Sequence, residues 1–115
     1  MTQSVPRVVE IYLDTEGCAP FSEWLAGLRD RTVRARIRVR IDRVRLGNLG
    51  DCRSVGDGVK ELRIDCGPGY RVYFGAAAGR LVLLLCGGDK RSQPADIERA
   101  RSFWADYRSR ENGPQ

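Results

Sequence analysis

The sequence predicts an α+β fold in the order strand, helix, helix, strand, strand, strand, helix, with a small, mostly antiparallel twisted sheet. Three observations predict this order. Two amphipathic helical patterns follow a short N-terminal strand, a glycine-proline turn at residues 67–69 joins two extended runs, and a continuous apolar run precedes a C-terminal helical pattern. At 115 residues the chain is expected to form a single domain, residues 1–115.

The N-terminal part is expected to hold one strand and two helices. The strand, Val8 to Leu13, is rich in β-branched and aromatic residues. The first helix is predicted from Pro20 to about Asp30, and the second from Thr32 to Leu46, with Gly47 as its C-terminal stop. Their apolar positions have the spacing of a buried stripe: Phe21, Trp24, Leu25 and Leu28 in the first helix, and Val33, Ile37, Ile41 and Val44 in the second.

The other face of the second predicted helix is rich in arginine. Its members are Arg34, Arg36, Arg38, Arg40, Arg43 and Arg45. Helical spacing spreads them around more than half of the cylinder, which is typical of an ordinary solvated face. Such diffuse charge can steer a protein towards RNA without contacting it specifically, so these arginines are not assigned to a site.

The C-terminal part begins after a glycine-punctuated connection, residues 47–58, in which no strand is predicted. Two hairpin strands, Val59–Ile64 and Tyr70–Phe74, are followed by Leu81–Cys86, whose continuous apolar run is typical of a central strand covered on both faces. Ser92 and Pro94 mark the start of a last helix. Its stripe is Ile97, Ala100, Phe103, Trp104 and Tyr107, and the tail from about residue 110 to 115 is expected to fray.

Composition favours an anionic partner. The chain has 20 Lys and Arg against 15 Asp and Glu, a net charge of +5, and a pI near 9.4. No stretch approaches the length of a membrane span, and no signal peptide is recognisable, so a cytoplasmic location without a membrane partner is expected. The four cysteines form no Cys-x-x-Cys pair and there is no histidine, so reduced thiols and no metal or other cofactor are expected.

The hairpin places charged side chains on alternate positions. Since residues two apart share a face of a strand, Glu61 and Arg63 face one side, and Lys60, Leu62 and Ile64 face the other. The turn at residues 67–69 then brings Arg63 across from either Arg71 or Tyr73. Cations that converge in this way repel one another, so the pattern favours a bound anion such as a phosphodiester.

Three motifs carry a family resemblance: Val59-Lys60-Glu61-Leu62-Arg63-Ile64, Gly67-Pro68-Gly69-Tyr70-Arg71-Val72-Tyr73, and Leu83-Leu84-Leu85-Cys86-Gly87-Gly88-Asp89-Lys90-Arg91-Ser92-Gln93 with Asp96-Ile97. In this order and spacing they resemble the RelE/ParE toxin superfamily, and more closely its phage-derived Gp49-like branch, the HigB-like addiction-module killer proteins. The resemblance covers roughly Val8 to Tyr107 and implies the RelE-like fold in the element order given above.

The resemblance implies a toxin of a type II toxin–antitoxin system. A cognate antitoxin, expected to be a helix-turn-helix protein encoded alongside, holds such a toxin inactive. The freed toxin is expected to be a metal-independent endoribonuclease, an mRNA interferase that cuts messages on the ribosome and leaves 2′,3′-cyclic phosphate ends. Two alternatives remain open: a ParE-like toxin that poisons DNA gyrase without nuclease activity, and a decayed toxin retained for its antitoxin's regulation. Retention of Arg63, Arg71 and Lys90 together favours the nuclease.

Because the chain has no histidine, it must rely on arginine and lysine to stabilise the charge of the reacting phosphate. Arg63 and Arg71 are the first candidates for binding the phosphate, and Lys90 and Arg91, where the last strand meets the last helix, are expected to close the patch from its edge. The alternative for each of these four residues, and above all for Arg63 and Arg91, is a structural ion pair. The possible acidic partners of the arginines are Glu61, Asp65, Asp89 and Asp96.

Proton transfer has weaker candidates. Glu61 is either a general base or the partner of a structural ion pair, and Tyr73 either stacks a base and donates a proton or belongs to the core. RelE toxins carry a tyrosine near the start of the final helix, whereas the corresponding region here is Pro94-Ala95-Asp96-Ile97. Either another group supplies that role or the reaction is organised differently. Asp96 is either such a group or a residue that is merely favourable with the helix dipole.

Overall fold

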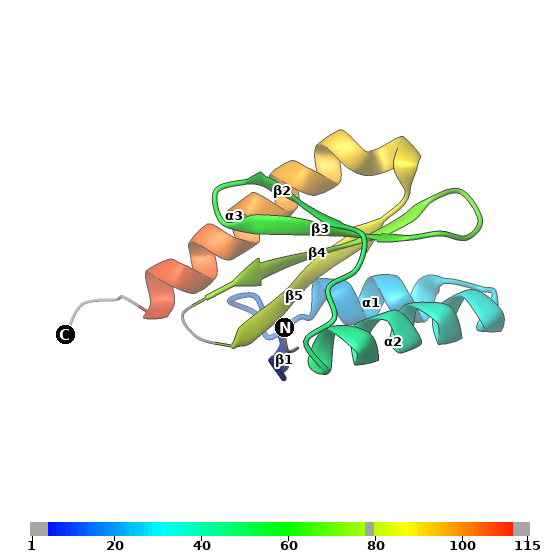
Figure 1. The fold of residues 1–115 in the computed structure, drawn as a ribbon. Helices are drawn as coiled ribbons and strands as arrows, with labels where there is room; N and C mark the ends of the chain where they lie inside the picture. The colour runs from blue at the N-terminus through cyan, green and yellow to red at the C-terminus, as the bar shows by residue number, and fades with distance from the viewer. Residues whose placement is uncertain (1–4, 78–79, 112–115) are drawn as a thin grey trace.

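The computed structural model, which describes residues 5–77 and 80–111, has three layers (Figure 1). Helices α1 (Pro20–Gly27) and α2 (Arg31–Arg45) cover one face of a five-stranded sheet, and the long helix α3 (Gln93–Glu111) crosses the other. A short 3-10 turn, η1 (Lys90–Ser92), precedes α3. The predicted α+β class is confirmed.

The sheet is mixed, with strand order β1-β5-β4-β3-β2. Only the β1–β5 pair is parallel among the described strands, and the remaining pairs are antiparallel, as predicted. The strands are β1 (Val8–Ile11), β2 (Cys52–Gly56), β3 (Val59–Ile64), β4 (Tyr70–Ala76) and β5 (Leu81–Gly88).

Strand β2 corrects the predicted order, which treated residues 47–58 as a connection. It pairs antiparallel with β3, so the described chain runs β-α-α-β-β-β-β-α. Asp57 and Gly58 form the two-residue turn between them, with φ values of 56° and 85°. Positive φ at both turn positions is typical of a tight hairpin, and the Asp-Gly pair was the available sequence signal.

Two helix boundaries also differ from the prediction. Helix α1 ends at Gly27 rather than near Asp30, because the Asp30 side chain caps α2 instead. Its Oδ1 accepts hydrogen bonds from the backbone N–H groups of Thr32 at 2.8 Å and Val33 at 3.4 Å. Helix α3 continues to Glu111, so residues 110 and 111 are helical rather than frayed, and the predicted tail at 112–115 lies outside the described residues.

Each face of the sheet has its own apolar core. The α1 and α2 stripes pack against Leu62, Val72 and Leu84 on one face. On the other face, Ala100 and Trp104 of α3 pack against residues that include Val59, Leu83 and Leu85. The predicted helical stripes and the two-sided burial of β5 are therefore confirmed. No helix in the described ranges is long and apolar enough to cross a membrane.

Candidate functional site

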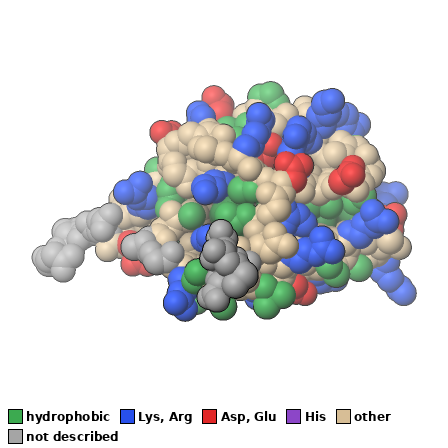
Figure 2. Space-filling model, in the orientation of Figure 1, with side chains coloured by type: hydrophobic (Ala, Val, Ile, Leu, Met, Phe, Trp, Pro, Cys, Tyr) green, Lys and Arg blue, Asp and Glu red, His purple; other side chains and the backbone are tan. Residues whose placement is uncertain are grey.

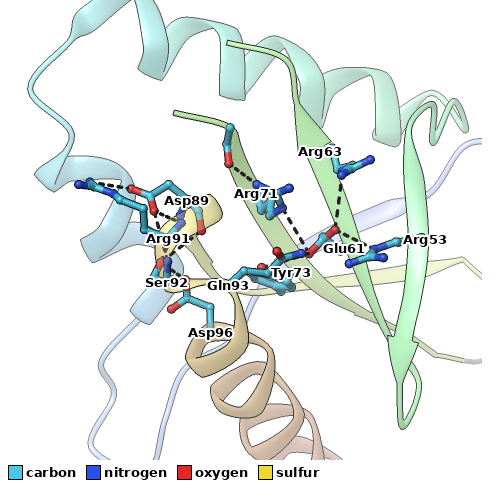
Figure 3. A network of polar contacts seen from close by, with 11 residues as sticks. Arg53, Glu61, Arg63, Arg71, Tyr73, Asp89, Arg91, Ser92, Gln93 and Asp96 are labelled. Carbon is cyan, nitrogen blue, oxygen red and sulfur yellow. Dashed lines mark hydrogen bonds and ion pairs between the residues drawn. The ribbon is translucent and has the colours of Figure 1, made fainter. Parts of the chain in front are cut away.

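Glu61 is the centre of a polar cluster on the α3-facing side of the sheet (Figure 3). It lies in β3 and has no exposed surface. Its carboxylate accepts hydrogen bonds from Gln93 Nε2 at 2.7 Å, Arg53 Nε at 3.0 Å and the Tyr73 hydroxyl at 3.2 Å. A buried carboxylate requires such pairing, because an isolated charge in the interior is very costly. Glu61 is thus a fixed anchor for the side chains around it.

Arg71 lies beside this anchor in β4 and is only 5% exposed. Its Nη1 donates to the Gly69 carbonyl at 2.6 Å, and its Nε lies 3.5 Å from Glu61 Oε2. Within the described part of the chain, that Nε has no hydrogen-bond partner. Gly69 has φ +78°, and a Cβ there would lie 3.1 Å from Arg71 Nη1, so glycine lets the guanidinium fold back onto the turn.

Arg63 completes the arginine pair of the hairpin. The strand register places it opposite Arg71 and places Tyr73 opposite Glu61, which decides between the two predicted partners. The Arg63 side chain is 47% exposed, and its Nε lies 3.9 Å from Glu61 Oε1. An ion pair this long and this exposed contributes little, so Arg63 is held near the anchor while its guanidinium stays accessible to an anion.

The sequence analysis missed two members of the cluster, Arg53 and Gln93. Arg53 lies on β2, the strand that was not predicted, and is opposite Glu61 in the β2–β3 register. Gln93 is the first residue of α3 and reaches Glu61 across 32 positions of the chain. The Asp57-Gly58 turn could have revealed Arg53 by predicting β2, whereas no local pattern points to Gln93.

Tyr73 is fully buried between the sheet and α3. Its burial, followed by the charge and hydrogen bond of Glu61, raises the pKa of the phenol well above its usual value. Tyr73 therefore stays neutral and donates a hydrogen bond to Glu61. It presents no surface on which a nucleobase could stack.

Lys90 and Arg91 lie in η1, at the edge of the cluster. The Lys90 backbone N–H lies 3.5 Å from the Pro68 carbonyl, which joins this turn to the β3–β4 hairpin, and its side chain is exposed. Arg91 instead pairs with Asp89 at 3.2 Å, with 85% of its side chain exposed. That side-chain hydrogen bond lowers the pKa of Asp89. The structure thus brings the Lys90 backbone to the hairpin turn. The Arg91 side chain points to its local acidic neighbour, Asp89 (Figure 3).

Asp96 fixes the start of α3 against β5. It is buried, accepts a hydrogen bond from the Ser92 hydroxyl, and lies 3.6 Å from Arg99 Nη1. A Cβ on Gly88 would lie 1.8 Å from an Asp96 carboxylate oxygen, so only glycine fits at that position of β5. This contact positions η1, and with it Lys90, relative to the strand that carries Arg71.

A hollow of about 270 Å³ opens beside the arginine pair. It is lined by Asp51, Arg63, Ile64, Asp65, Gly69, Tyr70 and Arg71. Three guanidiniums surround the single carboxylate of Glu61, so the cluster keeps an excess of positive charge. Basic side chains also cover much of the face seen in Figure 2, with acidic ones scattered between them. Planar guanidinium groups held in this way suit the binding of a phosphate and the charge of its transition state.

Metal ligands are not clustered in the described residues, since no group of three or more His, Cys, Asp or Glu side chains could hold an ion there. The arrangement provides cations and hydrogen-bond donors from the chain itself.

The fold and this cluster define a small α+β protein in which three guanidinium groups gather around one buried carboxylate. A family model described as phage derived protein Gp49-like (DUF891) matches residues 23–104. The chain belongs to this family, a branch of the RelE/HigB-like toxin superfamily. It is also 52% identical over 81 residues to an uncharacterized protein of Haemophilus influenzae (strain Rd), an alignment that covers 70% of this chain and 82% of the relative.

Proposed function

We propose that this chain is the toxin of a type II toxin–antitoxin system and that it cuts messenger RNA on the ribosome. Family membership supports a toxin with an antitoxin partner. The observation that carries the nuclease proposal is the convergence of Arg53, Arg63 and Arg71 on the buried carboxylate of Glu61. A toxin that only binds another protein has no need of guanidiniums held in advance around a phosphate-sized hollow.

In the proposed reaction, Arg71 and Arg63 bind the non-bridging oxygens of one phosphodiester. The ribose 2′-oxygen attacks the phosphorus and forms a new P–O bond, while the bond from phosphorus to the 5′-oxygen breaks. The 2′-hydroxyl proton passes to water, and the leaving 5′-oxygen takes a proton from the ammonium group of Lys90, a residue whose backbone N–H lies beside the hairpin turn. The products are a 2′,3′-cyclic phosphate and a 5′-hydroxyl end, and the arginines stabilise the charge on the phosphate throughout.

Glu61 and Tyr73 take positioning roles in this proposal. Neither has exposed surface, so neither reaches a ribose hydroxyl in this conformation. Tyr73 and Gln93 hold the carboxylate, and the carboxylate holds the arginines. Arg91, which is exposed while it pairs with Asp89, is proposed to contact the RNA backbone only at the edge of the site.

The test maps 5′ ends of transcripts after brief induction of the toxin in a heterologous bacterium. Wild type is compared with Arg71→Ala and with Arg38→Ala, a control that removes an exposed arginine of α2. New ends within translated frames that depend on Arg71 but not on Arg38 are expected, and they should carry 5′-hydroxyl groups. Intact transcripts during continued growth arrest would contradict the nuclease, and gyrase-linked DNA breaks would then identify a ParE-like toxin.

A further inference from the structure

A second hollow continues from the basic cluster along helix α2. It has a volume of about 510 Å³ and lies between α2 and the end of β3. Residues of α2 that line it are Thr32, Ala35, Arg36, Val39, Arg40 and Arg43, and they face Asp51, Arg63, Ile64 and Asp65. Arg63, Ile64 and the two aspartates line the smaller hollow as well, so the two hollows adjoin. We call the larger one the α2 groove.

The floor of the α2 groove is apolar. Val39 is 51% exposed although it is a large aliphatic residue, and Ala35 beside it is exposed as well. Val39 lies on the opposite side of the helix turn from Ile37 and Ile41, which are buried in the core, so it does not support the fold. An exposed aliphatic side chain in a groove favours contact with another apolar surface.

The walls of the α2 groove are basic. Arg36 and Arg43 are exposed, and their side chains form no ion pair or hydrogen bond within residues 5–77 and 80–111. Arg40, in contrast, is half-buried and donates to the carbonyls of Leu49 and Asp51. Two free arginines on α2 and Arg63 on the other wall leave positive charge around an apolar floor.

This combination fits a protein segment better than an RNA strand. Both ligands carry negative charge and both would meet Asp51 and Asp65, but RNA phosphates would gain nothing from the exposed aliphatic side chain of Val39. A peptide segment that carries both aliphatic and acidic side chains matches the floor and the walls together. We propose that the α2 groove binds an acidic, aliphatic segment of the cognate antitoxin, an inference that rests on the proposed toxin–antitoxin function.

Neutralisation follows from the shared residue Arg63. Because Arg63 lines both hollows, a segment seated in the α2 groove covers one of the two arginines proposed to bind phosphate. An acidic side chain of that segment pairs with Arg63 and removes its charge from the site. The antitoxin then competes with RNA without touching the buried Glu61.

The test measures the affinity of the purified chain for the antitoxin encoded beside it. The groove variant is Arg36→Glu/Arg43→Glu, whose positions lie seven residues apart on one face of α2. The matched control is Arg31→Glu/Arg38→Glu, which makes the same charge change seven residues apart on another face, outside the groove. We expect a rise in Kd of about tenfold or more for the groove variant, since like charges in an interface are strongly unfavourable, and less than about threefold for the control.

A second measurement locates the contact directly. A photo-crosslinking benzoylphenylalanine at position 39 is expected to join the antitoxin. The same group at position 46 is not expected to join the antitoxin. Leu46 is 68% exposed at the end of α2, but it does not line the groove. Crosslinking at 46 alone, or equal affinity of both double variants, would overturn the proposal.

Transcript cleavage without antitoxin separates this inference from the proposed function. If only the groove variant loses cleavage while its antitoxin affinity is unchanged, the groove binds RNA and the inference is wrong. If no variant cleaves RNA but only the groove variant loses the antitoxin, the docking surface stands and the nuclease proposal fails.

Discussion

The α3-facing side of the sheet is apolar at one end and polar at the other, although both ends are equally buried. Val59 and Glu61 are neighbours on this face of β3, and each has no exposed surface. Val59 packs in the cluster that contains Trp104, whereas Glu61 anchors three arginines. Replacing buried ion pairs by well-packed apolar residues is often neutral or stabilising by about 1–4 kcal/mol, so folding alone does not require the polar end.

The arginines of α2 differ in the same way from the arginines at the polar end of the sheet. On α2, arginines point to solvent, bind a nearby carbonyl, as Arg34 does with Leu28, or pair locally, as Arg45 does with the exposed carboxylate of Asp42. At the polar end of the sheet, guanidiniums from three strands share one carboxylate. The number of cations is thus less informative than the presence of a buried anion that fixes where they point.

Glu61→Gln is expected to have the largest effect on stability. The amide cannot neutralise Arg71, and its NH₂ group would face arginine donors, so a buried charge is left without its counter-charge. The free energy of unfolding should fall by about 3–5 kcal/mol. Urea denaturation measures this loss, and a fall of less than about 1 kcal/mol would show that the anchor is not needed.

Val59→Ala is the matched variant at the apolar end. It removes buried methyl groups two positions earlier on the same strand face, and should cost about 2 kcal/mol from lost burial and the remaining cavity. RNA cleavage per folded molecule should stay unchanged. If Val59→Ala and Glu61→Gln lowered cleavage equally, the polar end would have no separate role.

Arg71→Lys tests whether the shape of the cation matters. The variant keeps a positive charge near Glu61 but loses the planar group that binds Gly69 and Glu61 at once. The rate of RNA cleavage should fall by about 10²–10³-fold, as when one donor to a transition-state oxyanion is removed. Single-turnover cleavage at saturating RNA measures it, with Arg38→Lys on α2 as control. Full activity of Arg71→Lys would show that cleavage requires only a positive charge at this position, not the planar guanidinium group.

Arg53→Ala should have a smaller effect, because 56% of the Arg53 side chain is exposed. Glu61 keeps Gln93, Tyr73 and Arg71 as partners. After solvent screening, the loss in the free energy of unfolding should be about 1 kcal/mol, measured by the same urea titration. A loss as large as that of Glu61→Gln would make Arg53, rather than Arg71, the main counter-charge.

The sequence was sufficient where the pattern is local. The stripe of α2, the hairpin from Val59 and the double-sided burial of β5 follow from spacing alone. The register also placed Glu61 and Arg63 on one face. In contrast, β2 is short and has an irregular burial pattern, so its Asp-Gly turn was the only clear signal.

Contacts across long separations could not be predicted. Gln93 joins the cluster because α3 begins directly above β3, which depends on how Asp96 packs against Gly88. The full burial of Glu61 and Tyr73 likewise comes from the helix that covers them, not from their strands. The residue types of Glu61 and Tyr73 therefore suggest a catalytic role, and only their burial in the folded protein favours a positioning role instead.

Alkaline pH offers a finer comparison, of two tyrosines on this face of the sheet, because Tyr12 and Tyr73 each donate a hydrogen bond to a carboxylate. Burial, aided by Asp106, raises the pKa of Tyr12 to about 12, and burial with Glu61 raises that of Tyr73. Above the ordinary phenol pKa of about 10, the unfolded chain loses these protons while the folded chain keeps them. The folded state then binds more protons, so stability falls as pH rises through this range.

Substitution by phenylalanine removes the pH-dependent contribution of one tyrosine at a time. Tyr73→Phe should lower Tm near neutral pH, since it removes a hydrogen bond to Glu61, and its Tm difference from wild type should narrow above about pH 10. Tyr12→Phe should behave in the same way through its 2.6 Å bond to Asp106. Thermal melts at several pH values measure both differences. A Tm difference for Tyr73→Phe that stays constant to high pH would mean that water reaches the Glu61 cluster, and that Tyr73 is less protected than its full burial indicates.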